Sequence, residues 1–186
     1  MTGARKLTSA NHGRFNKEIY TLDGQDGSTL LMKVLSLQVS KDDALGEAEA
    51  LNMVHELHTS GMIQMPSRIH RKWFPALVME RKSGISLFSS PAYKRADTKE
   101  KKRELMKFVI EKVCEEVARI AVSTGILHYD NNPDNIFFTF SGDSIVSVDL
   151  IDYCPPYTYM IDNFKNVDKA KIVELCRTSS VWTALW

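Results

Sequence analysis

The stretch that most constrains the fold is 126–154, where polar residues with a fixed spacing stand between short apolar runs. The first run ends at His128, and Asp130 and Asn135 follow it by two and seven positions. The chain next enters a hairpin pattern that ends just before Asp152. A tight loop followed by a hairpin would bring Asp130, Asn135 and the second carboxylate close together. The stretch therefore predicts a polar site made almost entirely by local chain reversal.

The hairpin itself is predicted from alternating turn and apolar residues. An apolar run over 135–138 reads as its first strand, residues 141–143 (Ser-Gly-Asp) as its turn, and 144–148 as its return strand. Both Asp149 and Asp152 come at the end of the return strand. Either one can supply the second carboxylate.

Composition narrows the class of protein. A chain of 186 residues with 44% hydrophobic residues fits one domain or two small lobes. A net charge of +1 gives no reason to expect nucleic acid as a partner. No apolar run is long enough to span a membrane and no signal-peptide core is present, so we expect a soluble protein. Cys114, Cys154 and Cys176 are scattered, and we expect them to be unpaired in a reducing, cytosol-like environment.

The N-terminal part predicts strands followed by a helix. Strands are expected over 18–22 and 28–35, and Lys33 lies inside the second. Read alone, Lys33 is a lysine that extends its ammonium group to solvent from an edge strand. A capping box at Ser40 and Asp43 predicts a helix over 41–59. Apolar residues at helical spacing are expected to form its buried stripe: Ala44, Leu45, Ala48, Leu51, Val54 and Leu57.

The middle and end of the chain alternate between strands and helices. We expect strands over 68–74 and 76–80, a polar linker over 89–97, a long amphipathic helix over 98–123 and a last helix over 162–177. Phe108 and Leu175 are among the expected packing residues of the two helices. The apolar tail over 181–186 either packs onto the body of the protein or binds a partner.

The polar residues resemble known motifs. His128, Asp130 and Asn135 have the His-x-Asp-x-x-x-x-Asn spacing of the catalytic loop in the eukaryotic-like protein-kinase superfamily, and Asp152 stands where that superfamily carries its Asp-Phe-Gly turn. The resemblance extends back to Lys33. It implies an α+β, bilobal protein-kinase-like fold. Residues 1–80 would form a small β-rich N-lobe and residues 81–186 a reduced, helical C-lobe.

The resemblance also implies a role for each site residue in phosphoryl transfer from ATP. Asp130 would accept or orient the proton of the substrate hydroxyl, and Asn135 and Asp152 would hold Mg²⁺. Lys33 would hold the nucleotide phosphates, oriented by Glu47, with Glu49 as the alternative partner. His128 would support the loop.

A Val-Met-Glu…Gly-x-Ser-Leu pattern resembles the hinge of the same superfamily. Met79 would stand at the back of the adenine pocket. The backbone of Glu80, Arg81 and Lys82 would meet the adenine edge.

The sequence departs from the superfamily at several places. No Gly-x-Gly-x-x-Gly is present, and residues 12–16 (His-Gly-Arg-Phe-Asn) occupy the place of the phosphate-covering loop. Tyr129 replaces the arginine that reads an activation-loop phosphate, and Cys154 replaces the glycine of Asp-Phe-Gly. Only 34 residues follow Asp152 in this chain of 186, too few for the usual substrate-binding helices.

This reduced form resembles the minimal effector kinases that pathogenic bacteria inject into host cytoplasm. The resemblance implies a monomeric serine/threonine kinase whose substrate is a host protein, such as a heat-shock chaperone. Two alternatives remain: a pseudokinase that acts as a scaffold on a partner such as a ubiquitin-conjugating enzyme, and a kinase for small molecules. The retained catalytic groups favour an active protein kinase over a pseudokinase, because carboxylates that face one another without a catalytic role would only lower the stability of the protein.

Overall fold

The computed structural model describes residues 3–7, 15–23, 29–66, 71–130, 132–142 and 144–179. The chain divides into two compact units, Met1–Arg81 and Lys82–Trp186. The predicted division lies one residue earlier, between 80 and 81. Three predicted features lie outside the described residues: most of the stretch 12–16, the start of the strand over 68–74 and the apolar tail over 181–186.

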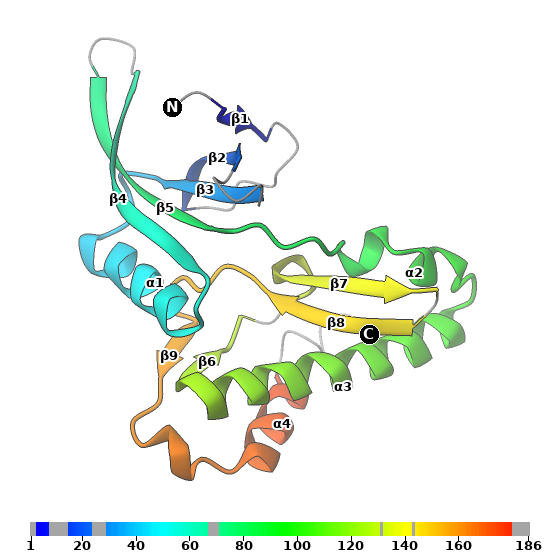
Figure 1. The fold of residues 1–186 in the computed structure, drawn as a ribbon. Helices are drawn as coiled ribbons and strands as arrows, with labels where there is room; N and C mark the ends of the chain where they lie inside the picture. Colours follow the sequence, from blue (N-terminus) through cyan, green and yellow to red (C-terminus); the bar gives the residue numbers. More distant parts are fainter. Residues whose placement is uncertain are drawn as a thin grey trace. The chain divides into compact units, whose positions relative to one another are not determined.

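The first unit is built on an antiparallel sheet with the strand order β1-β2-β3-β5-β4 (Figure 1). Its strands are β1 (Arg5–Lys6), β2 (Asn16–Asp23), β3 (Thr29–Leu35), β4 (Leu57–Pro66) and β5 (Arg71–Glu80). The helix α1 (Lys41–Met53) contacts β4 and β5. This mixture of sheet and helix agrees with the expected α+β class.

Alternation along β3 gives the sheet two different faces. Leu30, Met32 and Val34 are buried together with residues of β4 and β5. Lys33 and Leu35 point to the opposite face and are also buried. Both faces of β3 are therefore buried, which explains why its sequence is almost continuously apolar rather than alternating.

The helix α1 begins where the sequence predicts and ends earlier. The Ser40 hydroxyl accepts a hydrogen bond from the backbone N–H of Asp43 at 3.0 Å, as expected for the cap. The helix ends at Met53, and His55 takes a left-handed conformation with φ 61°. The predicted extension to residue 59 is therefore wrong, because Leu57 already begins β4 and pairs with β5. Leu45 is 56% exposed and is not part of the buried stripe.

The two strands predicted over 68–74 and 76–80 are one strand, β5. Pro75 lies within it, opposite Met62 of β4. A proline has no N–H to give to a sheet, so it is usually excluded from central strands. Here the pairing of β5 with β3 ends at Ala76, and Pro75 lies beyond that pairing.

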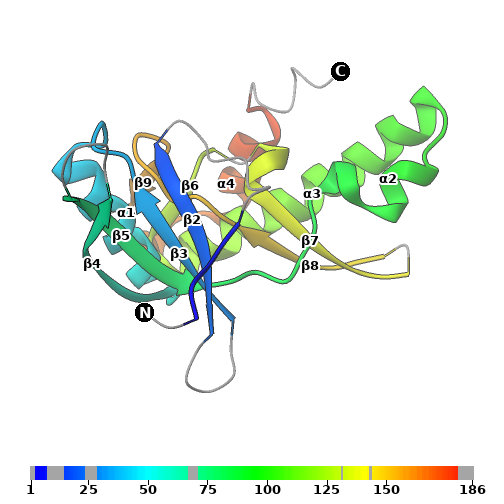
Figure 2. The same ribbon diagram turned by 90° about the horizontal axis from the view of Figure 1, so that it is seen from above.

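The second unit is mainly helical, with two short sheets (Figure 2). Its helices are η1 (Leu87–Ser89), α2 (Pro91–Arg95), α3 (Lys99–Thr124), η2 (Pro133–Asn135), η3 (Phe164–Asn166) and α4 (Lys169–Arg177). Its strands are β6 (Ile126–His128), β7 (Ile136–Ser141), β8 (Ser144–Leu150) and β9 (Thr158–Met160). Strand β6 pairs with β9, and β7 pairs with β8 in the predicted hairpin.

The long helix α3 confirms the prediction over 98–123 to within one residue. Thr98 caps its first turn, and Gly125 ends it with φ 78°. A Cβ atom at Gly125 would also lie 2.8 Å from the ring of Phe164. Both the left-handed backbone conformation and the lack of space for a side chain therefore favour glycine at this position. Phe108, which we expected to be packed, is 46% exposed.

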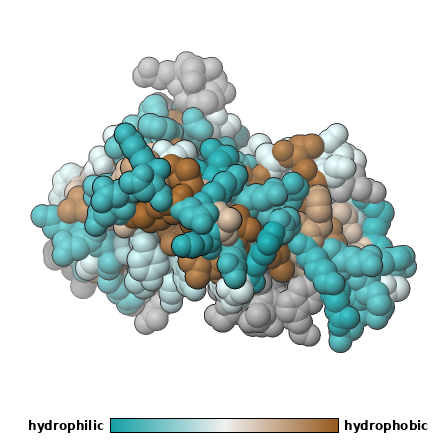
Figure 3. Space-filling view, turned by 90° about the horizontal axis from the view of Figure 1, so that it is seen from below, coloured by the Kyte–Doolittle hydropathy of each residue, from teal (hydrophilic) through white to brown (hydrophobic). Residues whose placement is uncertain are grey.

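Two other segments differ from the sequence prediction. The linker over 89–97 contains the short helix α2, started by Ser90 as cap and Pro91 at the first helical position. The last helix is shorter than predicted, since α4 begins only after Asp168. Leu175 on α4 is 60% exposed rather than packed. Other apolar residues also reach the surface, in separate patches among polar side chains (Figure 3).

The cysteines are not all unpaired, contrary to our prediction. Cys114 of α3 and Cys176 of α4 form a disulfide, and Cys154 remains a buried thiol. The prediction failed because the pairing depends on how two helices pack, which spacing along the chain does not reveal. The cysteines therefore give no argument for a reducing environment. No helix of the described ranges is long and apolar enough to cross a membrane.

Candidate functional site

The first unit contains a buried ion pair at the centre of its sheet. Lys33 Nζ lies 2.5 Å from Glu47 Oε1, and the two residues are 5% and 1% exposed. Lys33 is on the face of β3 opposite the apolar cluster, whereas Glu47 shares the buried side of α1 with Ala50 and Leu51. Removing two charges from water is costly, so such a pair needs close and complementary contact.

The same helix decides between the two candidate glutamates. Glu49 is exposed, while Glu47 is buried and bonded to Lys33. Glu47 and Leu51 are four residues apart and so lie on one side of the helix, whereas Glu49 is turned away from it.

The predicted hinge residues lie at the end of β5. Met79 is half-buried opposite Leu31, and Glu80 is exposed opposite Leu30. The backbone N–H of Arg81 donates to the carbonyl of Thr29 at 3.2 Å. That N–H therefore already has an acceptor in the chain, so adenine recognition would have to use other backbone groups of this segment.

In the second unit, Asp130 is held by the two asparagines that follow it. Its Oδ1 accepts from Asn132 Nδ2 and its Oδ2 from Asn135 Nδ2, each at 2.8 Å. Asn135 Nδ2 also lies 3.0 Å from the Asp130 carbonyl. A carboxylate can accept about four hydrogen bonds, so these contacts orient Asp130 and leave further capacity on its oxygens.

Asn132 has a second role that the sequence analysis missed. Its side-chain Oδ1 accepts from the N–H of Asp134 and caps η2, the helical turn that ends at Asn135. The available signal was Asn132 directly before Pro133, an arrangement typical of a turn start. This turn is what brings Asn135 back to Asp130.

Backbone contacts join this loop to the turn that carries Asp152. The N–H of Ile151 donates to the Asn135 carbonyl at 2.9 Å. His128 Nε2 donates to the Ile151 carbonyl at 2.9 Å, and the His128 and Tyr153 rings pack edge-to-face with their centroids 4.9 Å apart. The backbone N–H and the carbonyl of Ile151 are thus both hydrogen-bonded.

The electrostatics of His128 fit a supporting role. The residue is fully buried, and this burial lowers its pKa below 6.5. The bond to Ile151 and the carboxylates of Asp130 and Asp152 oppose the shift without reversing it. A neutral imidazole is therefore the form that this structure stabilises.

The two candidate carboxylates after the hairpin have different surroundings. Asp149 is in β8 opposite Phe137, and its Oδ1 lies 3.8 Å from Lys82 Nζ. Asp152 lies beyond the strand with φ 65°, a left-handed conformation uncommon for residues other than glycine. Such a conformation is often found where a functional site requires it.

The polar groups of the loop and turn suit a magnesium-bound phosphate. Asn135 bonds to Asp130 through Nδ2, so its Oδ1 is not used in these bonds and is one possible oxygen ligand, and the Asp152 carboxylate is a second hard donor. Within the described residues, no three His, Cys, Asp or Glu side chains gather as a complete metal cage. Magnesium is usually held by one or two protein oxygens together with substrate phosphates and water, which matches this small donor set.

No protein-family model and no curated protein sequence matches this chain.

Proposed function

We propose that this chain is a protein kinase that transfers the γ-phosphate of magnesium ATP to a serine or threonine hydroxyl of a protein. The observation that carries the proposal is the network in which Asn132 and Asn135 orient the Asp130 carboxylate while Asn135 also bonds to the Asp152 turn. Phosphoryl transfer depends mainly on positioning and on charge stabilisation, and fixed carboxylate and amide groups supply both.

Each residue has a defined task in the proposed reaction. Asp130 orients the substrate hydroxyl and receives its proton as the oxygen attacks phosphorus. Asn135 and Asp152 would hold the magnesium that accompanies ATP. The carboxylate fits this task because its two bonds from asparagine hold it in one orientation.

In the first unit, Lys33 would bind the nucleotide phosphates with its ammonium group. Glu47 keeps that group charged and in one place through a contact of 2.5 Å. An unpaired lysine in such a buried position would tend to lose its proton. The ion pair therefore supports a lysine that can meet a phosphate in the charged form.

The first experiment measures transfer of labelled γ-phosphate from magnesium ATP to proteins of a eukaryotic cell extract. Asp130→Ala is expected to lower the rate by at least about a hundredfold. The matched control is Asp134→Ala, an exposed carboxylate of the same loop, which should keep the rate of the wild type. Full activity in Asp130→Ala would contradict the proposal.

A pseudokinase scaffold is the second candidate, favoured by the missing glycine-rich sequence. It predicts a folded protein that captures a partner, such as a ubiquitin-conjugating enzyme, without any transfer of label. A purified partner added to the transfer assay separates the two candidates. A scaffold leaves the partner and all extract proteins unlabelled, whereas a kinase that needs activation becomes active on addition.

A further inference from the structure

Positive charge is concentrated on one part of the second unit, where α2 meets the start of α3. Residues 94–107 contain seven basic and three acidic side chains, which leaves 17 basic against 20 acidic in the rest of the chain. All seven are exposed: Lys94, Arg95, Lys99, Lys101, Lys102, Arg103 and Lys107. We call these seven residues the α2–α3 basic surface.

We propose that the α2–α3 basic surface binds an acidic segment of a partner protein. The proposal does not depend on phosphoryl transfer, since none of the seven residues belongs to the site around Asp130.

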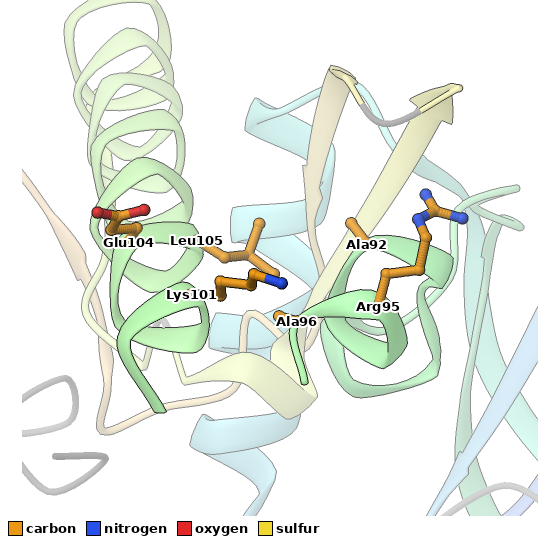
Figure 4. A pocket seen from close by; sticks show the side chains of 6 residues that line it. All are labelled: Ala92, Arg95, Ala96, Lys101, Glu104 and Leu105. Carbon is orange, nitrogen blue, oxygen red and sulfur yellow. The ribbon is translucent and has the colours of Figure 1, made fainter. Parts of the chain in front are cut away.

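A shallow, open hollow in this surface gives a partner side chain a place to pack. It has a volume of about 330 Å³ and is lined from α2 by Ala92, Arg95 and Ala96 and from α3 by Lys101, Glu104 and Leu105 (Figure 4). Figure 4 shows Lys101 of α3 beside Leu105, with its ammonium group directed toward α2, whereas the Arg95 side chain extends from α2 away from these two residues. An acidic side chain with its methylene groups matches this combination of charge and apolar lining.

Three of these charges stand at an unfavourable end of a helix. Lys99, Lys101 and Lys102 lie in the first turns of α3, where the positive end of the helix dipole disfavours cations. Two local contacts offset this only in part: Lys101 bonds to Asp97 at 2.8 Å, and Lys102 lies 5.1 Å above the ring of Tyr93. Binding of an anionic group would relieve the repulsion and satisfy the same cations.

A protein segment fits this surface better than a continuous phosphate backbone. Asp97, Glu100 and Glu104 are exposed among the seven basic residues and would repel a uniform line of phosphates. In a peptide, acidic residues can alternate with neutral or apolar ones. Such a pattern can place neutral residues beside the three carboxylates, including Glu104 of the hollow, and acidic residues beside the cations.

The test is fluorescence anisotropy of the full chain with a short labelled peptide in which Asp and Glu alternate with Leu and Ser. We expect binding that weakens with added salt. Arg95→Glu/Lys101→Glu should weaken it more than about tenfold, a loss typical of reversed interface charges. Lys169→Glu/Lys171→Glu, two exposed lysines of α4 with the same change in net charge, is the control and should bind like the wild type.

Circular dichroism checks that each variant is folded, and Arg95→Gln/Lys101→Gln replaces the charge-reversed variant if that one is not. The proposal is overturned by absence of peptide binding, by equal losses in both double variants, or by an isosteric Asn/Gln peptide that binds equally well. Tighter binding of a single-stranded oligonucleotide or of anionic lipid vesicles through Arg95 and Lys101 would also overturn it, since the partner would then not be a protein.

Discussion

Reduction of the disulfide between Cys114 and Cys176 should be the strongest single perturbation of the second unit. The bond links α3 to α4 across a sequence separation of 62 residues, and the loop it closes contains Asp130, Asn135 and Asp152. Both cysteines are buried between the helices. Cutting the bond therefore changes the freedom of the unfolded chain far more than it changes the surface of the folded one.

The expected size follows from the loop length. In the chain-entropy description, closing a loop of 62 residues stabilises a protein by about 4 kcal/mol. The folded state should survive reduction because α4 keeps other contacts: Ile172 is buried, and Arg177 bonds to Glu111 of α3. The loss should therefore appear as a lower free energy of unfolding, with α4 still in place.

Urea unfolding with and without a phosphine reductant measures this loss. A denaturant slope of about 2 kcal/mol per molar converts the expected loss into a midpoint lower by about 2 M. Cys114→Ala/Cys176→Ala is the control, because its midpoint should not respond to the reductant. A thiol count in denaturant should find one reactive thiol, that of Cys154, before reduction and three after it.

A wild-type midpoint that does not move on complete reduction would contradict the expected stabilisation by the disulfide. Three thiols before reduction would instead refute the disulfide itself. The two failures are distinguishable, since the first leaves the thiol count at one. In that case the unfolded chain already keeps α3 and α4 together without the bond.

Three further changes test the two units. Lys33→Met should lower the free energy of unfolding in urea by about 3 kcal/mol, because it leaves the buried Glu47 carboxylate without its cationic partner. The double variant Lys33→Met/Glu47→Leu should recover part of this loss. Stability should fall as the pH decreases below 6.5, because His128 has a lowered pKa in the folded state and the unfolded chain takes up the proton first; His128→Gln should flatten this part of the pH curve. Gly84→Ala should lower the free energy of unfolding in urea by about 1–3 kcal/mol, because the new methyl group would lie 2.9 Å from the backbone nitrogen of Phe138 in β7. Gly61→Ala is the control and should not show this loss, because a methyl group there has no atom within 4 Å.

The elements that the sequence predicted well carry their own start and stop signals. The helix α3 has a threonine cap, a long apolar stripe and a closing glycine, all within the segment itself. The hairpin of β7 and β8 has a turn at Gly142 between two apolar runs. In both cases the neighbouring residues along the chain decide the structure.

The errors occurred where distant pairing overrides local preference. Leu57 continues the helical spacing of Leu51 and Val54, yet it begins β4 because β5 offers a ten-residue partner. The two strands predicted on either side of Pro75 are one strand, and only the register shows that the pairing of β5 with β3 ends at Ala76, before the proline. Neither pairing can be read from the residues of one strand alone.

The candidate site shows the same dependence on distance along the chain. Asn135 bonds to Asp130 across five positions, and the spacing alone brought them together in the prediction. Lys33 bonds to Glu47 across 14 positions, and here the sequence left two glutamates because the rotation of α1 was open. Cys114 joins Cys176 across 62 positions, and that contact was missed. Each longer contact requires more of the tertiary structure to be known before its partner can be chosen, so a loop that positions its own polar groups is the part of a site that a single sequence predicts best.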